Sequence, residues 1–248
     1  MAQVIKLHPA SSLRASCHQC SLSNLCLPLA VEESDLDRLE DIIQQGRIFS
    51  RGEHIFQQNA PFRSVYAVRS GAVKTSIITE NGEEQVTGFY MPGELVGLDS
   101  MSNETYACNA KALERTSICE FPVERLEDLT ARLPGLQHHF FQLMSQEIRG
   151  SHQLSILLSK NTAEERIAAL LLSLSSRFQR RRMSGTAFSL PMARNDIANF
   201  LGLAVETVSR VFTRFQNQGV IKARGREVEL MDLGALQMIA RDPERQSL

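Results

Sequence analysis

Residues 193–219 read ARNDIANFLGLAVETVSRVFTRFQNQG, and this stretch decides the fold of the C-terminal part of the chain. Two amphipathic segments meet at Gly202, a residue that tolerates the positive φ that a tight turn between helices requires. Seven apolar side chains are spaced to close a shared core: Ile197, Leu201, Leu203, Val208, Val211, Phe212 and Phe215. The next residues, VIKARGREVEL at 220–230, predict a basic hairpin that turns at residues 224–226. The pattern predicts a winged helix-turn-helix.

The polar face of the second helix carries side chains suited to reading double-stranded DNA. In such a module the N-terminal part of the second helix enters the major groove. Arg210 can donate two hydrogen bonds to a guanine and Glu206 can accept one from a cytosine, and their spacing places both on one face. Ser209 can reach a base edge or a phosphate, and Val205 can contact a thymine methyl group. The alternative for Glu206 and Arg210 is an exposed ion pair, which is compatible with DNA reading.

Charge is divided unevenly along the chain, although the net charge of all 248 residues is only −1. Residues 1–159 hold 13 basic and 19 acidic side chains, whereas residues 160–230 hold 12 basic and 6 acidic ones. An acidic body followed by a basic block is typical of a regulatory domain joined to a domain that contacts phosphates.

Three cysteines lie within ten residues in the pattern C-x2-C-x5-C: Cys17, Cys20 and Cys26. An odd total of five cysteines without an export signal argues against a disulfide framework. The residues between the three are polar and Pro28 follows them, which favours a metal-binding loop over thiols packed in a core. A closed zinc site or an iron–sulfur cluster needs a fourth ligand. Cys108 and Cys119 are the main candidates, and spacing distinguishes neither between them nor between the two metals; His18, between two ligand cysteines, is expected to point away.

Residues 47–122 have the composition of closely spaced β-strands. Runs rich in Val, Ile, Thr, Tyr and Phe alternate with turn signals, of which Asn81-Gly82 is a strong hairpin turn. Half of the fourteen glycines fall between Gly46 and Gly97. These features predict a small antiparallel barrel or jelly roll.

After Pro134-Gly135 the pattern becomes helical. Six residues follow the spacing of a coiled-coil seam and are the predicted dimer interface: Phe141, Met144, Ile148, Ser151, Ser155 and Leu158. A second apolar stripe can pack on the β domain of the same chain: Phe140, Leu143, Leu154 and Leu157. The two stripes favour a homodimer helix over an ordinary buried helix, with a seam weakened by its small serines.

The chain thus divides into five predicted parts. They are a cysteine-rich loop (1–29), an antiparallel β-roll (30–133), a dimerisation helix (134–160), a winged helix-turn-helix domain (161–232) and a C-terminal tail (233–248). The fold class is α+β. No apolar run approaches the ~20 residues of a membrane span, and the first residues lack a signal-peptide core, so we expect a cytoplasmic protein without a membrane partner. P-loop, GxGxxG, HExxH and nucleophile-elbow patterns are absent from the sequence, and we expect no enzyme.

The sequence resembles the FNR/Anr branch of the cyclic-AMP-receptor-like (CRP/FNR) transcription regulators from about Cys17 to Leu230. The segments that carry the resemblance are CHQCSLSNLCLP, AVRSGAVKT, ENGEEQVTGFY, LERTSICEFP, LLSKNTAEERIA and LGLAVETVSRVFTRFQ. The cysteine loop joined to VETVSR at this distance is the most specific combination.

The resemblance implies an oxygen-labile 4Fe–4S cluster with four ligands: Cys17, Cys20, Cys26 and Cys119. LERTSICEFP resembles the family segment that holds the last ligand, which selects Cys119 and leaves Cys108 as a strand residue. In the family the cluster promotes dimerisation and binding to a two-fold symmetric operator, mainly for activation, and oxygen reverses both. Val205, Glu206, Ser209 and Arg210 match the base-reading positions. Arg69, Ser70 and the turn at Gly82 resemble surfaces that contact RNA polymerase.

Ser151 departs from the family pattern, which has an acidic residue on the dimer seam. Because an acid there adds like-charge repulsion, its absence should favour the dimer, and we expect a regulator less completely switched off by air.

Two rival regulators share the fold. A cyclic-nucleotide-gated protein is disfavoured because the stretch that follows Gly93-Glu94, residues 95–110, contains no arginine that could hold a phosphate. A zinc-stapled or thiol-redox-switched regulator has the same ligands and stays open.

Overall fold

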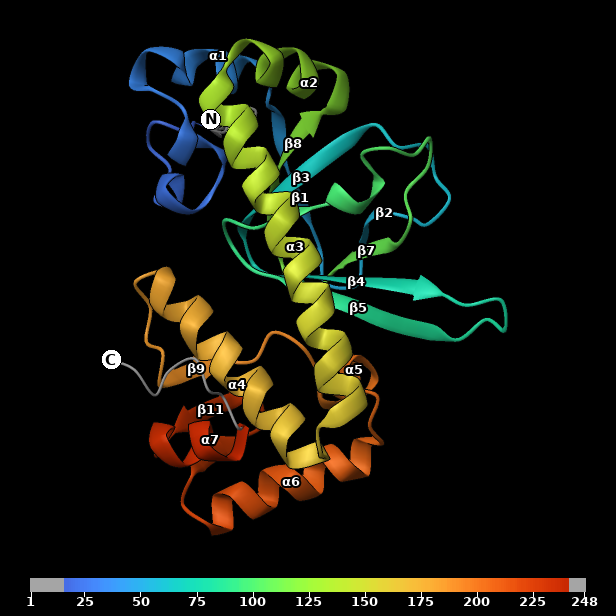
Figure 1. Ribbon diagram of the computed structural model, residues 1–248, viewed down its shortest axis with the longest axis vertical. Helices are drawn as coiled ribbons and strands as arrows, with labels where there is room; N and C mark the ends of the chain where they lie inside the picture. Colours follow the sequence, from blue (N-terminus) through green and yellow to red (C-terminus); the bar gives the residue numbers. More distant parts are fainter. Residues whose placement is uncertain (1–15, 241–248) are drawn as a thin grey trace, which may run out of the picture.

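The computed structural model describes residues 16–240, and Figure 1 shows two globular parts joined by one long helix, α3 (Pro134–Lys160). A β-roll lies at one end of the molecule and a helical module with a small sheet at the other. Residues 1–15 of the predicted cysteine loop and residues 241–248 of the predicted tail lie outside the described part. None of the helices within residues 16–240 is long and apolar enough to cross a membrane.

The β-roll consists of two four-stranded sheets in which every neighbouring pair is antiparallel. The first sheet has the order β1 (Gln44–Phe49), β8 (Thr116–Pro122), β3 (Ser64–Ser70), β6 (Leu95–Val96). The second has the order β2 (His54–Phe56), β7 (Asn109–Ala112), β4 (Val73–Ile78), β5 (Glu84–Tyr90). This arrangement confirms the predicted antiparallel roll.

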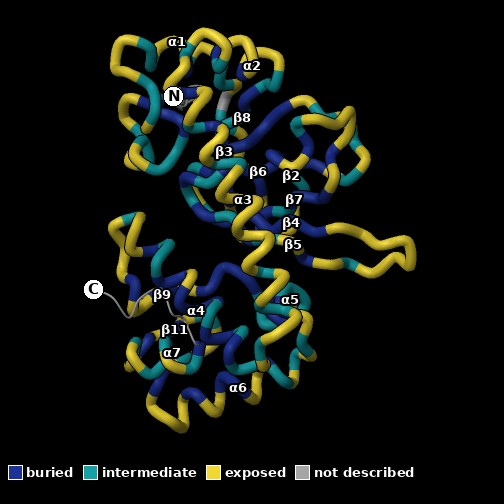
Figure 2. The backbone as a smooth tube through the Cα atoms, in the orientation of Figure 1, coloured by how far each residue is buried: buried dark blue, intermediate teal, exposed yellow. Residues whose placement is uncertain are grey.

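The β4–β5 hairpin turns where the sequence predicts. Gly82 has φ +80°, and the hairpin projects from the roll as an exposed finger (Figure 2). At the other end of β4, Gly71 has φ +81°, and a Cβ there would lie 2.5 Å from the hydroxyl of Thr116. Both turns therefore require glycine.

The cysteine segment and the start of α3 are surrounded by short helices that the sequence analysis does not anticipate. These are η1 (Ser23–Leu25), η2 (Leu27–Ala30), η3 (Glu33–Asp35), α1 (Leu36–Ile42), η4 (Leu98–Ser100) and α2 (Val123–Arg132). Leu39 of α1 and Leu126 of α2 are buried in one apolar cluster with Leu136 of α3. The short helices thus close one end of the β-roll around the beginning of the long helix.

The C-terminal module is the predicted winged helix-turn-helix. Its elements are α4 (Ala163–Arg180), β9 (Ala187–Ser189), α5 (Arg194–Leu201), α6 (Val205–Asn217), β10 (Ile221–Arg224), β11 (Glu227–Leu230) and α7 (Leu233–Ala240). A capping box between Thr162 and Glu165 begins α4. Gly202 ends α5 with φ +61°, and Gly225 turns the wing with φ +61°.

One predicted element is corrected. Residues 233–240, expected to belong to a tail, form helix α7, which packs on α4 and buries Leu236 completely. The Asp232 carboxylate accepts a hydrogen bond from the Ala235 N–H at 2.8 Å and begins the helix.

The β-roll and the DNA-binding module are connected by an ion-pair cluster around Glu94, which follows β5. Arg177 of α4 donates from Nε to Glu94 Oε1 at 2.9 Å and also pairs with Oε2. Arg181 donates to Oε1 at 2.6 Å and to the carbonyl oxygen of Pro92 at 2.7 Å. The Arg181 side chain is only 4% exposed. Two guanidinium groups of one domain thus hold one carboxylate of the other.

A second contact joins α5 to strands β4 and β5. Lys74 of β4 donates to the Asp196 carboxylate at 2.8 Å, and its side chain is 9% exposed. Asn199 accepts from the Val86 N–H at 2.6 Å and donates to the Glu84 carbonyl at 2.6 Å. The first helix of the helix-turn-helix is therefore bound to the β4–β5 hairpin.

We expect Glu94→Gln to lower the free energy of unfolding at pH 7 by about 1–3 kcal/mol, because two arginines lose a charged partner. Burial alone would raise the pKa of Glu94, but the charges of Arg177 and Arg181 outweigh it and hold the pKa below the usual range. A depressed folded-state pKa stabilises the fold above the unfolded value of ~4.3 and loses that contribution as pH falls.

Urea unfolding between pH 7 and pH ~3 would measure both effects. The variant should lose less stability on acidification than the wild type, whereas Glu80→Gln, an exposed hairpin control, should behave as the wild type. An equal acid dependence in Glu94→Gln and the wild type would contradict the role of this cluster.

Candidate functional site

The exposed face of α6 contains three of the four residues expected to read DNA. Glu206, Ser209 and Arg210 are exposed, while Val205 is half-buried against the core of the module. Val208, Val211, Phe212 and Phe215 form the opposite, buried face. Figure 2 shows α6 at the end of the molecule farthest from the β-roll. The face is accessible although α5 is bound to the β-roll.

The side chains of Glu206 and Arg210 do not pair with each other within the described chain. Arg210 instead donates weakly to the backbone carbonyl of Glu206 at 3.4 Å, and the Ser209 hydroxyl bonds the Val205 carbonyl at 3.0 Å. Arg214, one turn further on, pairs with Glu164 of α4. The Glu206 carboxylate and the outer guanidinium nitrogens of Arg210 therefore remain available for base edges.

The cysteines of the loop lie next to β8. Cys17 is buried in the apolar cluster that contains Leu27 and Phe121, and Cys26 and Cys119 pack against the same cluster. Cys20 is partly exposed. The four cysteines that the family resemblance implies as ligands thus come from one loop and one strand that are adjacent in space.

The thiols are close enough to influence each other electrostatically. Burial raises the pKa of Cys17 to about 12, and Cys119 and Cys20 add to the increase. Burial also raises the pKa of Cys26 to about 12 and that of Cys119 to about 11. A bound soft metal would therefore have to displace thiol protons, as metal binding to cysteines generally does.

Arg69 of β3 places a positive charge close to the cysteine thiols. Its charge lowers the pKa of both Cys119 and Cys17, against the larger effect of burial. The sequence analysis assigned Arg69 with Ser70 to a polymerase-contacting surface. The structure places half-buried Arg69 beside the thiols, while Ser70 and Gly82 are exposed at strand and hairpin ends.

Cys108 lies in a different core. It is 2% exposed among Phe49, Phe56 and Tyr106, and Asp99 accepts its hydrogen bond, which together with burial raises its pKa. Cys108 and Cys119, between which sequence spacing does not distinguish, therefore lie in separate apolar clusters.

The distance between the sulfurs bears on which metal group they fit. Zn–S bonds of about 2.3 Å place the sulfurs of a tetrahedral zinc site about 3.8 Å apart. Within residues 16–240, no three of the cysteine sulfurs lie within 4.8 Å of one another. The one group that does meet this distance is His18, Asp37 and Glu40, whose His18 and Asp37 are exposed.

Helix α3 exposes an apolar stripe. Phe141 is 59% exposed and Ile148 56% exposed, and Ser151 and Ser155 follow on the same stripe. Met144 and Leu158, also expected on the seam, are half-buried within the chain. Ile156, 60% exposed, is a further apolar residue that the sequence analysis missed because it lies beside the coiled-coil spacing. The apolar surface is thus broader than a strict seam.

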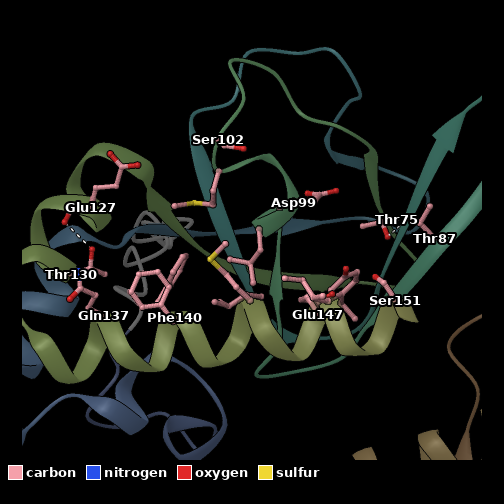
Figure 3. A pocket seen from close by; sticks show the side chains of 18 of the residues that line it. Thr75, Thr87, Asp99, Ser102, Glu127, Thr130, Gln137, Phe140, Glu147 and Ser151 are labelled. Atoms are coloured by element: carbon pink, nitrogen blue, oxygen red, sulfur yellow. Dashed lines mark hydrogen bonds between the residues drawn. The ribbon is translucent and has the colours of Figure 1, made fainter. Parts of the chain in front are cut away.

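A cavity of about 750 Å³ lies between α3 and the β-roll (Figure 3). Its polar lining includes the carboxylates of Asp99, Glu127 and Glu147, and no lysine or arginine lines it in the described chain. A phosphate-bearing ligand would find like charges here and no guanidinium.

The cysteine loop contacts the start of α3 directly. Leu27 and Leu136, both fully buried, share one apolar cluster with Phe140. Gly135 lies so close to η2 that a Cβ would be 2.9 Å from the carbonyl oxygen of Ala30. The loop is also pressed against the roll, because a Cβ on Gly93 would lie 2.9 Å from Cβ of Leu25. A displacement of the cysteine loop would therefore change the packing around the first turn of α3.

Comparisons with known proteins agree with this architecture. Residues 46–132 match the family of cyclic nucleotide-binding domains, and residues 165–239 match the Crp-like helix-turn-helix domain. The chain is 54% identical to the transcriptional activator protein Anr of Pseudomonas aeruginosa over 94% of both chains. It is 40% identical to the fumarate and nitrate reduction regulatory protein of Yersinia pestis, over 98% of this chain and 97% of that one. The structure of FixK2 from Bradyrhizobium japonicum matches with a TM-score of 0.73 and 28% identity, over 80% of this chain and 97% of that one.

Proposed function

The chain belongs to the CRP/FNR family of DNA-binding transcription regulators, and we propose that it senses oxygen through a 4Fe–4S cluster held by Cys17, Cys20, Cys26 and Cys119. Its similarity to regulators rather than enzymes also agrees with the absence of catalytic motifs. The observation that carries the proposal is that Cys17, Cys26 and Cys119 of β8 meet at one apolar cluster, with Cys20 close enough to raise the pKa of Cys17 and Cys119.

One further observation supports a site for a soft metal group at these thiols. The charge of Arg69 lowers the pKa of Cys17 and Cys119 and so favours their thiolate forms, against the larger effect of burial. When bound, a 4Fe–4S cluster supplies soft iron–sulfur bonding to all four thiolates together with sensitivity to oxygen.

The chain itself can transmit the state of this site. Four thiolates bound to one group fix the loop against β8, and the loop then supports α3 through Leu27 and Leu136. Released thiolates leave the apolar packing and the hydrogen bonds of residues 16–18 to α1 to hold the loop. We propose that this difference shifts the pairing of two α3 helices, with Phe141, Ile148 and Ile156 at the homodimer interface.

The dimer would place two copies of α6 on a two-fold symmetric operator. In this proposal Val205, Glu206, Ser209 and Arg210 read base pairs, and the basic wing touches phosphates. Ser70 and Gly82, both exposed, are proposed to contact RNA polymerase in activation. Arg69 contributes there only through its exposed part.

We also propose that the chain binds no cyclic nucleotide. The carboxylate of Glu94, the second residue of the Gly-Glu motif of nucleotide-binding relatives, is held by Arg177 and Arg181. The cavity between α3 and the β-roll that Asp99 and Glu147 line presents carboxylates and, among the described residues, no guanidinium to a phosphate.

Anaerobically purified protein should contain about four iron and four sulfide per chain and lose its visible absorption in air. Cys119→Ser should abolish the iron, whereas Cys108→Ser, the matched control in the other core, should retain it. One zinc and no iron per chain in elemental analysis would contradict the proposed oxygen sensor and would indicate a zinc-stapled or thiol-switched regulator.

Arg210→Ala should weaken binding to a specific operator by about 1–3 kcal/mol and relax the preference at one base pair. Titration of operator and single-base variants at fixed salt measures both, with exposed Arg180→Ala, which lies outside α6, as the control. Equal weakening on all sequences, random DNA included, would show that Arg210 contacts only phosphate.

Ser151→Asp should weaken the dimer of the metal-free protein by ~1 kcal/mol, because two like charges meet across the seam. Sedimentation of the metal-free protein over a range of concentrations measures the shift. Gln153→Glu adds a charge on another face of α3 and should leave the equilibrium unchanged. A wild-type protein that is strictly monomeric at micromolar concentration would refute the role given to Ser151.

A further inference from the structure

The first cysteine of the loop is attached to helix α1 by one carboxylate. Oε1 of Glu40 accepts hydrogen bonds from the backbone N–H of Cys17 at 2.5 Å, the backbone N–H of His18 at 2.9 Å and the Ser16 hydroxyl at 3.0 Å. One turn earlier on α1, Asp37 contacts Nε2 of His18 at 3.0 Å. Residues 16–18 are thus bound at two points to one face of α1.

Among the described residues of the loop, 16–29, no other contact gives Cys17 comparable support. Their backbone forms short local turns, such as Cys20 N–H to the Cys17 carbonyl at 3.2 Å and Ser23 N–H to the Cys20 carbonyl at 3.2 Å. The Cys17 N–H itself donates to Glu40. Hydrogen bonds to a carboxylate are stronger than those between neutral groups, so this contact is the firmest polar anchor of the segment.

Helix α1 is a rigid base for this anchor. Leu39, adjacent to Glu40, is completely buried and belongs to the same apolar cluster as Cys17, Leu27 and Leu126. Packing of the apolar cluster holds α1 in place, and the hydrogen bond to Glu40 holds the main chain of Cys17 against α1.

We propose that Glu40 is the positioning residue that holds Cys17 ready to bind the cluster, an inference that rests on the proposed role of Cys17 as a ligand. A multidentate site binds more tightly when its ligands are already in place, and groups that orient ligands commonly tune metal affinity. Glu40 holds the backbone of Cys17, and its charge also adds to the raised pKa of the Cys17 thiol.

Two variants separate the hydrogen bonds from the charge. Glu40→Gln keeps an acceptor oxygen at the same distance from the backbone, whereas Glu40→Met has similar length and no such acceptor. Asp41→Asn removes a charge from the exposed neighbouring position and serves as the control.

The first readout needs no metal. In metal-free protein, iodoacetamide modification is followed separately at each cysteine by peptide mass spectrometry. Glu40→Met should raise the rate at Cys17, which is only 8% exposed, by roughly tenfold, since local opening becomes easier. Cys108 should be unaffected, Glu40→Gln should stay close to the wild type, and Asp41→Asn should match it.

The second readout is iron release to a chelator from anaerobically reconstituted protein. Glu40→Met should release iron several-fold faster than the wild type, and Glu40→Gln should release iron at a rate close to that of the wild type. Unchanged Cys17 modification and unchanged iron release in Glu40→Met would overturn the positioning role alone. Equal acceleration at Cys17 and Cys108 would overturn it too, because it would indicate general loosening. Iron missing from the wild type as well would overturn the cluster, and with it the role of Glu40 toward a metal.

Discussion

The packing of η2 against the first turn of α3 is the contact on which the regulatory arrangement depends. Leu27 of the cysteine segment and Leu136 of the helix are both fully buried in one cluster, and Gly135 leaves no room for a side chain beside Ala30. This cluster also receives Cys17 and Cys119. The same apolar core therefore supports the proposed sensor ligands and the base of the helix proposed to carry the dimer surface, and close packing is the proposed route by which a change at one reaches the other.

The joint between the β-roll and the C-terminal module combines apolar packing with ion pairs. Glu94 is held by Arg177 and Arg181, and Lys74 and Asn199 bind α5 to the β-roll. The helix-turn-helix is thus oriented by the β-roll as well as by α3, while its recognition face stays exposed. Two arginine side chains of the C-terminal module bind the Glu94 carboxylate, which agrees with the proposal that the signal enters at the cysteine loop.

Local patterns were sufficient to predict much of this structure. Gly202, Gly225 and Asn81-Gly82 mark turns whose geometry depends on a few neighbouring residues, and the prediction of the winged helix-turn-helix and the β-roll is confirmed. The choice between Cys108 and Cys119 depends on which face of the roll each strand presents, and sequence spacing does not encode that. The Arg177–Glu94 pair joins residues 83 positions apart, so no local motif could reveal it. Helices α1, α2 and α7 were missed because short amphipathic runs beside strands or at the chain end give a weak periodic signal.

We propose that the metal state of the cysteine loop controls the pairing of two chains through α3. Sedimentation velocity of anaerobic protein, recorded both at the protein absorption and at the visible absorption of the cluster, is the decisive measurement. The coloured species should sediment as a dimer, and the same sample, bleached by air, should shift toward the monomer, though incompletely because Ser151 adds no charge to the seam. A coloured species that sediments as a monomer, or a dimer fraction unchanged by bleaching, would refute control of pairing by the metal site.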